Sequence, residues 1–163
     1  MDKKGFTNAE PKIGGKVLVV THCAKKKRDV KQATPQLLYL SKRIERVYRI
    51  AKSYGAQFGV ISAKYGLVLE DEQISLYEKT IETGHDVDRI VAQISEKLKE
   101  RGAWNWLIYF GTAKNYITAF YCAAWKAGYG SRTFFVGRNS MGGLDELKRI
   151  LLQSCQHLIY EYI

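Results

Sequence analysis

The sequence has only three cysteines, and they are widely spaced with no CxxC pair. An odd number at such spacing argues against a disulfide framework and a cysteine zinc site, and it favours the reducing cytoplasm. The three histidines are scattered, so no metal is expected either. No apolar run approaches the roughly 20 residues of a membrane span, and residues 1–15 lack the apolar core of a secretory signal. We therefore expect a cytoplasmic protein without membrane contact.

Nucleotide-loop motifs are also missing. The chain has neither GxxxxGK[ST] nor GxGxxG, so a dinucleotide cofactor has little support and no cofactor is expected. With 163 residues, 46% apolar and 26% charged, the composition is that of one ordinary globular domain. We predict a flexible N-terminal segment over 1–15 and a single domain over 16–163.

The charge that is present is unevenly distributed. Residues 25–52 hold ten Lys/Arg against two acidic residues, whereas residues 70–100 hold four against nine. A basic segment beside an acidic one favours a polyanion partner bound by one face, although a solvated helix surface gives the same pattern. The predicted nucleic-acid contacts are Lys26, Arg28, Lys42, Arg43, Arg46 and Arg49.

Short β-branched or aromatic runs alternate with amphipathic helical segments. Strands are predicted at 16–23, 56–62, 104–111 and 132–137, and helices at 34–55, 85–102, 113–130 and 144–162. Thr34 and Pro35 suit the start of the first helix, and Gly55 suits its end. The alternation implies βαβ crossovers, so we predict a single three-layer α/β/α domain with a mostly parallel sheet of four to five strands.

Ligands of open parallel sheets bind beyond the carboxyl ends of the strands. All four predicted strands are followed by polar or glycine-rich sequence: THCAKKKR, SAKYG, GTAKNY and GRNSMGG. Gly111, Thr112, Gly142 and Gly143 precede helices and would present amides to a phosphate, or they simply make tight turns. The residues after the first strand that would bind substrate are Cys23, Lys25 and Lys27. A second interpretation of Cys23 is a small buried side chain.

Residues 64–84 form one irregular segment that is too long for an ordinary connection and typical of a functional loop. The acidic cluster of Glu70, Asp71 and Glu72 is expected near the same strand edge, where a carboxylate such as that of Asp71 serves as general base or stabilises a cationic sugar. Lys64 would depress its pKa or bind phosphate. Tyr65 and Tyr77 would stack on a base. The alternative is that these acidic residues only cap helices and solvate turns.

A run of residues in this segment resembles a known family. Ser62-Ala63-Lys64-Tyr65-Gly66-Leu67, followed by Asp71, Ile74, Tyr77 and Thr80, is similar to the pattern SAKYGLLxPDxxIxPYDxTL. That pattern is the hallmark of a family of small, poorly characterised proteins from bacteria, archaea and phages. The LYLS run at 38–41, Cys23 with the lysines after it, and Gly142-Gly143-Leu144 are similar to further elements of the family.

The sequence departs from the pattern at three positions. Glu70 and Leu76 stand where the family has proline, and Glu78 replaces an aspartate, which keeps an acidic side chain there. More distantly, the run resembles that of the DNA-binding peroxide-stress protein YaaA. The expected α/β/α architecture is also similar to uracil-DNA-glycosylase-like domains.

Together these features predict a nucleic-acid-associated enzyme that acts at an N-glycosidic bond. Ser62 and Lys64 would bind phosphate, Tyr65 and Tyr77 would shape a base pocket, and Asp71 or Glu78 would orient water. A non-enzymatic DNA- or RNA-binding protein of the YaaA type is the alternative. A small nucleotide hydrolase or transferase is the third.

Overall fold

The first strand of the chain lies in the middle of the central sheet. The computed structural model describes residues 16–81, 83–102, 104–137 and 143–162, the last ten of these by backbone alone. The predicted segment 1–15 and Gly142 lie outside the described residues. The strands β1 (Val17–His22), β3 (Gln57–Ser62), β6 (Trp106–Phe110) and β7 (Thr133–Val136) are parallel, and β4 (Gly66–Leu69) is antiparallel at one edge. The order is β4-β3-β1-β6-β7, which confirms the predicted mostly parallel sheet.

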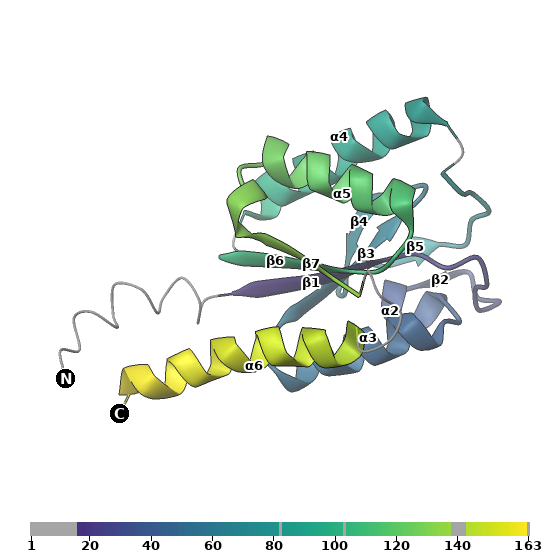
Figure 1. Cartoon of the computed structure of the whole chain (residues 1–163). Coiled ribbons are helices and arrows are strands. Elements are labelled where there is room, and N and C mark those ends of the chain that lie inside the picture. The colour runs from purple at the N-terminus through teal and green to yellow at the C-terminus, as the bar shows by residue number, and fades with distance from the viewer. Residues whose placement is uncertain (1–15, 82, 103, 138–142, 163) are drawn as a thin grey trace.

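Helices cover both faces of this sheet. The helices α3 (Lys42–Ser53) and α6 (Gly143–Tyr162) lie on one face, and α4 (Gly84–Arg101) and α5 (Lys114–Lys126) lie on the other (Figure 1). A short helical turn, η1 (Gly130–Arg132), leads into β7. The three-layer α/β/α architecture is therefore confirmed, and it explains why β1 is buried almost throughout.

The periodic apolar residues of α4 face the sheet, as predicted. Ile90, Val91, Ile94 and Leu98 are buried. The helix begins with a capping box in which the Thr83 hydroxyl accepts from the amide of Asp86. Burial of this stripe fixes α4 against the sheet and against α5.

The helix predicted over 34–55 is interrupted. A four-residue helical turn, α2 (Pro35–Leu38), ends before α3 starts at Lys42. Between them the backbone pairs with the segment after β1, because the Arg28 amide donates to the Leu38 carbonyl and the Leu40 amide to the Lys26 carbonyl. The prediction of one continuous helix is wrong because these long-range hydrogen bonds replace helical ones. Gly55, with φ of +74°, does end α3 as predicted.

The break makes Ser41, rather than Thr34, the side chain that caps a helix. The Ser41 hydroxyl accepts from the Ile44 amide at 3.3 Å, whereas the Thr34 hydroxyl is buried without a hydrogen-bond partner among the described residues. We expect Ser41→Ala to lower the free energy of unfolding by about 1 kcal/mol and Thr34→Ala to change it by less than about 0.5 kcal/mol. Urea unfolding of both variants measures this. A larger loss from Thr34→Ala would contradict the interruption.

The segment 64–84 is more regular than the sequence indicates. It contains β4 and the short β5 (Ile74–Ser75), which pairs antiparallel with β2 (Gln32–Ala33). Ser62 and Gly66 are paired across a tight hairpin between β3 and β4. Gly66 takes a φ of +74°, which other residues rarely adopt. The run SAKYG thus forms a tight hairpin between two strands and is not the start of a long irregular loop.

Candidate functional site at the carboxyl edge of the sheet

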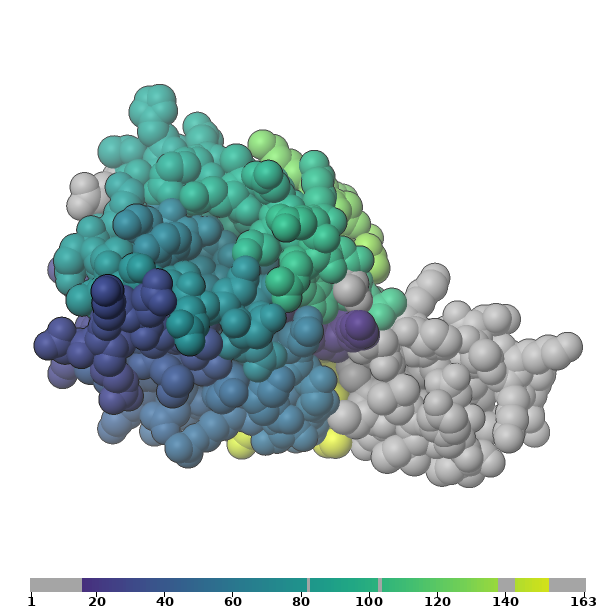
Figure 2. All heavy atoms as spheres, turned by 180° about the vertical axis from the view of Figure 1, so that it is seen from behind, coloured from purple at the N-terminus to yellow at the C-terminus, as the bar shows by residue number. Residues whose placement is uncertain are grey.

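The four parallel strands all point to the same end of the sheet, which we call the carboxyl edge because their carboxyl ends lie there. The opposite end, where these strands begin, is called the amino edge. The chain after β1 lies at the carboxyl edge, where it projects in dark blue-purple at the left of Figure 2. The hairpin after β3, the Gly111–Thr112 turn after β6 and Gly137 after β7 meet the same edge. The sequence correctly predicts the convergence of these segments.

Four buried or partly buried tyrosines, Tyr39, Tyr77, Tyr109 and Tyr116, surround Cys23 and form what we call the tyrosine cluster. The Cys23 thiol lies 3.3 Å from the Tyr116 hydroxyl, and the hydroxyls of Tyr39 and Tyr77 lie 2.5 Å apart. Burial, followed by the neighbouring Cys23 thiol, raises the pKa of Tyr39 and of Tyr77 above the usual range. The phenols therefore stay neutral and can donate hydrogen bonds. Cys23 is 8% exposed, so it is the small buried side chain of the second interpretation.

Lysine side chains cover the outer side of this cluster. The Lys27 ammonium lies 4.5 Å from the ring centroid of Tyr77 and 5.8 Å from that of Tyr39. Lys64 lies 5.2 Å from the ring of Tyr65, which meets Tyr77 edge to face at 5.5 Å. These cation–π contacts hold two positive charges beside the aromatic rings. The structure thus brings together four residues that the sequence assigns to substrate binding, namely Lys27, Lys64, Tyr65 and Tyr77.

Ser62 has a local structural role in the hairpin. Its hydroxyl accepts from the amides of Lys64 and Tyr65 at 3.1 and 3.0 Å. The Arg89 guanidinium on α4 donates to the carbonyls of Ala63 and Lys64. Ser62 is fully buried. The predicted contact of its hydroxyl with a phosphate would therefore require the hairpin to open.

His22 packs between the tyrosine cluster and the Gly111 turn. Its Nδ1 lies 3.3 Å from the Tyr109 hydroxyl, and its ring stacks on Tyr116 at 5.3 Å. A Cβ on Gly111 would come within 2.8 Å of the imidazole, so only glycine permits this approach. Burial, followed by the charge of Arg43, lowers the pKa of His22 to about 3. The imidazole is neutral at physiological pH.

This neutral histidine makes the fold sensitive to acid. Between pH 6.5 and 3 the unfolded chain binds a proton at His22 that the folded protein excludes, so stability falls as the pH falls. We expect this group to contribute a slope of up to about 1.4 kcal/mol per pH unit in that window. His22→Asn should flatten the difference in urea-unfolding free energy between pH 6.5 and 4. An unchanged pH dependence in the variant would contradict a neutral, buried His22.

Three hydrogen bonds hold the Arg43 side chain at this edge. One of its terminal nitrogens donates to the Thr21 hydroxyl at 2.5 Å and to the His22 carbonyl at 2.8 Å, and the other donates to the Cys23 carbonyl at 3.4 Å. Burial lowers the pKa of Arg43 from its ordinary value. Among the described residues no carboxylate forms an ion pair with it. A partly buried cation that forms no ion pair among the described residues is suited to binding an anion.

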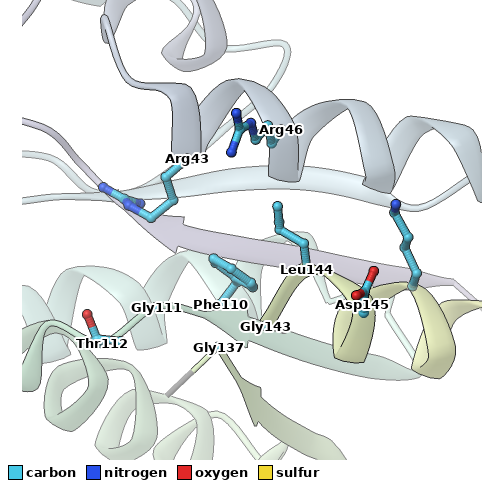
Figure 3. Close-up of a pocket in the computed structure, with 10 residues that line it drawn as sticks. Arg43, Arg46, Phe110, Gly111, Thr112, Gly137, Gly143, Leu144 and Asp145 are labelled. Carbon is cyan, nitrogen blue, oxygen red and sulfur yellow. The ribbon is translucent and has the colours of Figure 1, made fainter. Parts of the chain in front are cut away.

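The Arg43 side chain lines a pocket of about 480 Å³ between the first turns of α3 and α6 (Figure 3). Three cationic side chains line the pocket against one carboxylate, Asp145, among the described residues. The lining consists of Arg43, Arg46, Phe110, Gly111, Thr112, Gly137, Gly143, Leu144, Asp145 and Lys148. Gly111, Thr112 and Gly143 are therefore brought together as the sequence predicts. Asp145 and Lys148 are not found by sequence reasoning, although both lie in the first two turns after the Gly-Gly pair.

The other predicted basic residues divide into two groups. Lys25, Lys26 and Arg28 are exposed in the segment after β1, and Lys42 is exposed at the start of α3. These lie at the carboxyl edge. Arg49 lies further along α3, where it pairs with Glu45 at 2.7 Å on an exposed helix surface. The contact of Arg49 with nucleic acid stays a prediction.

The acidic cluster lies at the amino edge, opposite its expected place. Because β4 runs antiparallel, it carries the chain back across the sheet, and the Glu70 amide donates to the carbonyl of Phe58 near the start of β3. Asp71 is exposed and lies 3.4 Å from Arg101 at the end of α4. Glu72 pairs with Lys97 at 2.6 Å. The expected proximity of Asp71 to Lys64 is wrong. Glu78, one residue after Tyr77, is exposed.

Two further properties hold for the part of the chain that the structure describes. No group of three or more His, Cys, Asp or Glu side chains there could hold a metal ion. None of the helices in that part combines the length and apolar character that a membrane crossing requires.

Comparison with known proteins identifies a family without naming a reaction. No curated protein and no solved structure matches the chain. The profile of one family, described as a family of unknown function (DUF6884), matches residues 17–133, which run from β1 to the start of β7 and include the tyrosine cluster and Arg43. The chain therefore belongs to this family of unknown function, DUF6884.

Proposed function

We propose that this protein binds nucleic acid at the carboxyl edge and holds a backbone phosphate in the pocket between α3 and α6. The observation that carries the proposal is Arg43. Its guanidinium is fixed by three acceptors and has no carboxylate partner among the described residues, and the side chain lines a pocket that Arg46 and Lys148 also line. A phosphate oxygen would supply the missing negative charge and would accept strong, charge-assisted hydrogen bonds.

The surroundings of the pocket support a polyanion over a single small anion. Lys25, Lys26 and Lys42 are exposed around the same edge, and Lys27 and Lys64 lie over the tyrosine rings. The acidic cluster at 70–72 is turned to the other edge, where it pairs with lysine and arginine. Positive charge spread over one end of a molecule favours a partner with many phosphates and a salt-dependent affinity.

For the reaction we propose hydrolysis of an N-glycosidic bond of the bound nucleotide. The supporting observation is that one carboxylate among the described residues, Asp145, lines the same pocket in which the phosphate would bind. The bond between C1′ and the base nitrogen breaks, a water oxygen bonds to C1′, and one water proton passes to the released base. Asp145 would orient that water and stabilise the cationic sugar. In a duplex the nucleotide must first leave the base stack.

The decisive experiment is incubation of the purified protein with single- and double-stranded DNA and RNA that include modified bases. Fluorescence anisotropy at two salt concentrations reports binding, and mass spectrometry reports free bases. Salt-sensitive binding with base release supports both parts of the proposal. Salt-sensitive binding without release leaves a binding protein and rejects the reaction. No binding to any polymer, with binding of free nucleotides instead, would reject the nucleic-acid assignment in favour of a small-nucleotide enzyme.

A further inference from the structure

The outer face of α5 carries two large aromatic side chains that the function proposed above does not use. Tyr121 and Trp125 are one helical turn apart and are 52% and 54% exposed. Lys114 and Thr118 precede them at the same helical spacing and are also exposed. Exposure of two neighbouring aromatic rings to this extent is typical of a contact surface. We call these four residues the α5 stripe.

Both rings pack against neighbouring residues of the fold. The Tyr121 ring lies 6.1 Å from the ring of Phe135 on β7 and 6.4 Å from that of Trp125. The Trp125 indole packs directly on Gly130 of η1, since a Cβ at that position would overlap the ring. One side of the indole is therefore seated on backbone while the rest stays open to solvent. Rings held in this way lose little conformational entropy when a flat ligand stacks on them.

The chain segment that carries the α5 stripe has charge of one sign. Residues 101–144 contain five arginines and lysines and no aspartate or glutamate. Lys114 and Lys126 are exposed on α5 itself, and the Arg132 guanidinium lies 4.8 Å from the Tyr129 ring. Basic side chains among exposed aromatic rings suit a ligand that presents both phosphates and aromatic bases.

The α5 stripe is continuous with the proposed phosphate pocket. Thr112 lines that pocket and also a second hollow of about 390 Å³, whose other lining residues are Lys114, Ile117 and Thr118. From Lys114 to Trp125 the helix rises about 16 Å, which corresponds to on the order of five stacked nucleotides at about 3.4 Å per base. A strand anchored in the pocket would thus pass through the hollow to the aromatic rings.

We infer that α5 is a stacking platform for unpaired bases of a single-stranded nucleic acid whose phosphate lies in the pocket lined by Arg43 and Arg46. The inference rests on the proposed function and adds a preference for single strands over duplex. In a duplex the base faces are already stacked, so they cannot be offered to Tyr121 and Trp125. Free bases stack on aromatic side chains regardless of sequence.

The test measures binding of a fluorescent 20-nucleotide single-stranded DNA, the matching RNA, and the DNA duplex. Trp125→Ala and Tyr121→Ala are expected to weaken single-strand binding at least about fivefold each and to leave duplex binding and the slope of affinity against salt unchanged. Trp125→Phe should restore most of the affinity. The matched control is Leu152→Ala, which removes an exposed apolar side chain from a different helix, α6. Thermal unfolding of each variant verifies the fold.

Failure of this inference and failure of the proposed function give different experimental results. If Arg43→Ala abolishes binding while the aromatic variants bind single strands normally, the platform is rejected and the phosphate site remains. If the aromatic variants instead turn a dimer into a monomer in sedimentation, the α5 stripe is a self-association surface and the inference is overturned. If the wild-type protein binds no nucleic acid, both fail together.

Discussion

Arg43→Ala is expected to weaken nucleic-acid binding about 10- to 150-fold. The guanidinium is the one pocket cation fixed by three hydrogen bonds, and a charge-assisted hydrogen bond to phosphate contributes about 1.5–3 kcal/mol. Arg43→Lys keeps the charge but loses the planar fork, so it should recover only part of the affinity. Fluorescence anisotropy with single-stranded DNA and RNA at fixed salt measures all three proteins.

The matched control for this prediction lies on the same helix. Arg49 is exposed and already pairs with Glu45, so Arg49→Ala should change the affinity by less than about twofold. Both variants must first be shown to be folded, because Arg43 also joins α3 to the end of β1. A similar loss in both would indicate that only the overall charge of α3 matters. That outcome would remove the pocket from the proposal.

Asp145→Asn is expected to reduce base release about 10²- to 10⁴-fold while leaving binding unchanged or slightly tighter. The amide cannot orient water as a base or stabilise a cationic sugar. Removal of the negative charge from the proposed phosphate pocket would also relieve repulsion. The readouts are therefore opposed, since turnover falls and affinity does not. Single-turnover base release, followed by mass spectrometry, gives the first quantity, and anisotropy gives the second.

Asp71→Asn is the control that separates the structure from the sequence-based expectation. The sequence predicts Asp71 as the catalytic carboxylate, whereas the structure has it at the amino edge beside Arg101. We expect this variant to release bases at the wild-type rate. Loss of release in Asp71→Asn, with normal release in Asp145→Asn, would restore the original assignment and would require the acidic turn to reach the carboxyl edge.

The parts of the fold that the sequence predicts are those decided by local periodicity. The stripe of Ile90, Ile94 and Leu98 on α4 and the continuous apolar run of β1 need no distant partner to be recognised. Gly55 ends a helix for a purely local reason as well. These elements and their alternation suffice for the layered α/β/α arrangement.

The errors arise where distant segments override local preference. The residues at 38–40 have a helical pattern but pair with 26–28, which no local property indicates. The hairpin at 62–66 did have a signal, namely a short turn with Gly66 between two apolar runs. Once the hairpin is recognised, the antiparallel return of β4 and the removal of Asp71 to the amino edge follow.

The convergence of segments at the carboxyl edge follows from the sequence, whereas the residues that line the pocket there follow only in part. Arg43, Arg46 and Arg49 are three residues apart, and each such step turns a helix by about 60° from alignment, so Arg43 and Arg49 face directions about 120° apart. Spacing alone therefore cannot identify the one that points inward. Tyr109 and Tyr116 belong to ordinary strand and helix patterns, and only the fold brings them beside Cys23.

The proton of the Thr21 hydroxyl points in a fixed direction. The hydroxyl donates that proton to the Phe110 carbonyl at 2.7 Å, so the oxygen can only accept from Arg43. With Thr21 fully buried, neither partner can be exchanged for water. The orientation of the Arg43 guanidinium is thus settled when β1, β6 and α3 come together, before any ligand arrives. The conformational entropy of this side chain is lost during folding, so a phosphate bound as proposed would meet a preorganised donor without a further ordering cost.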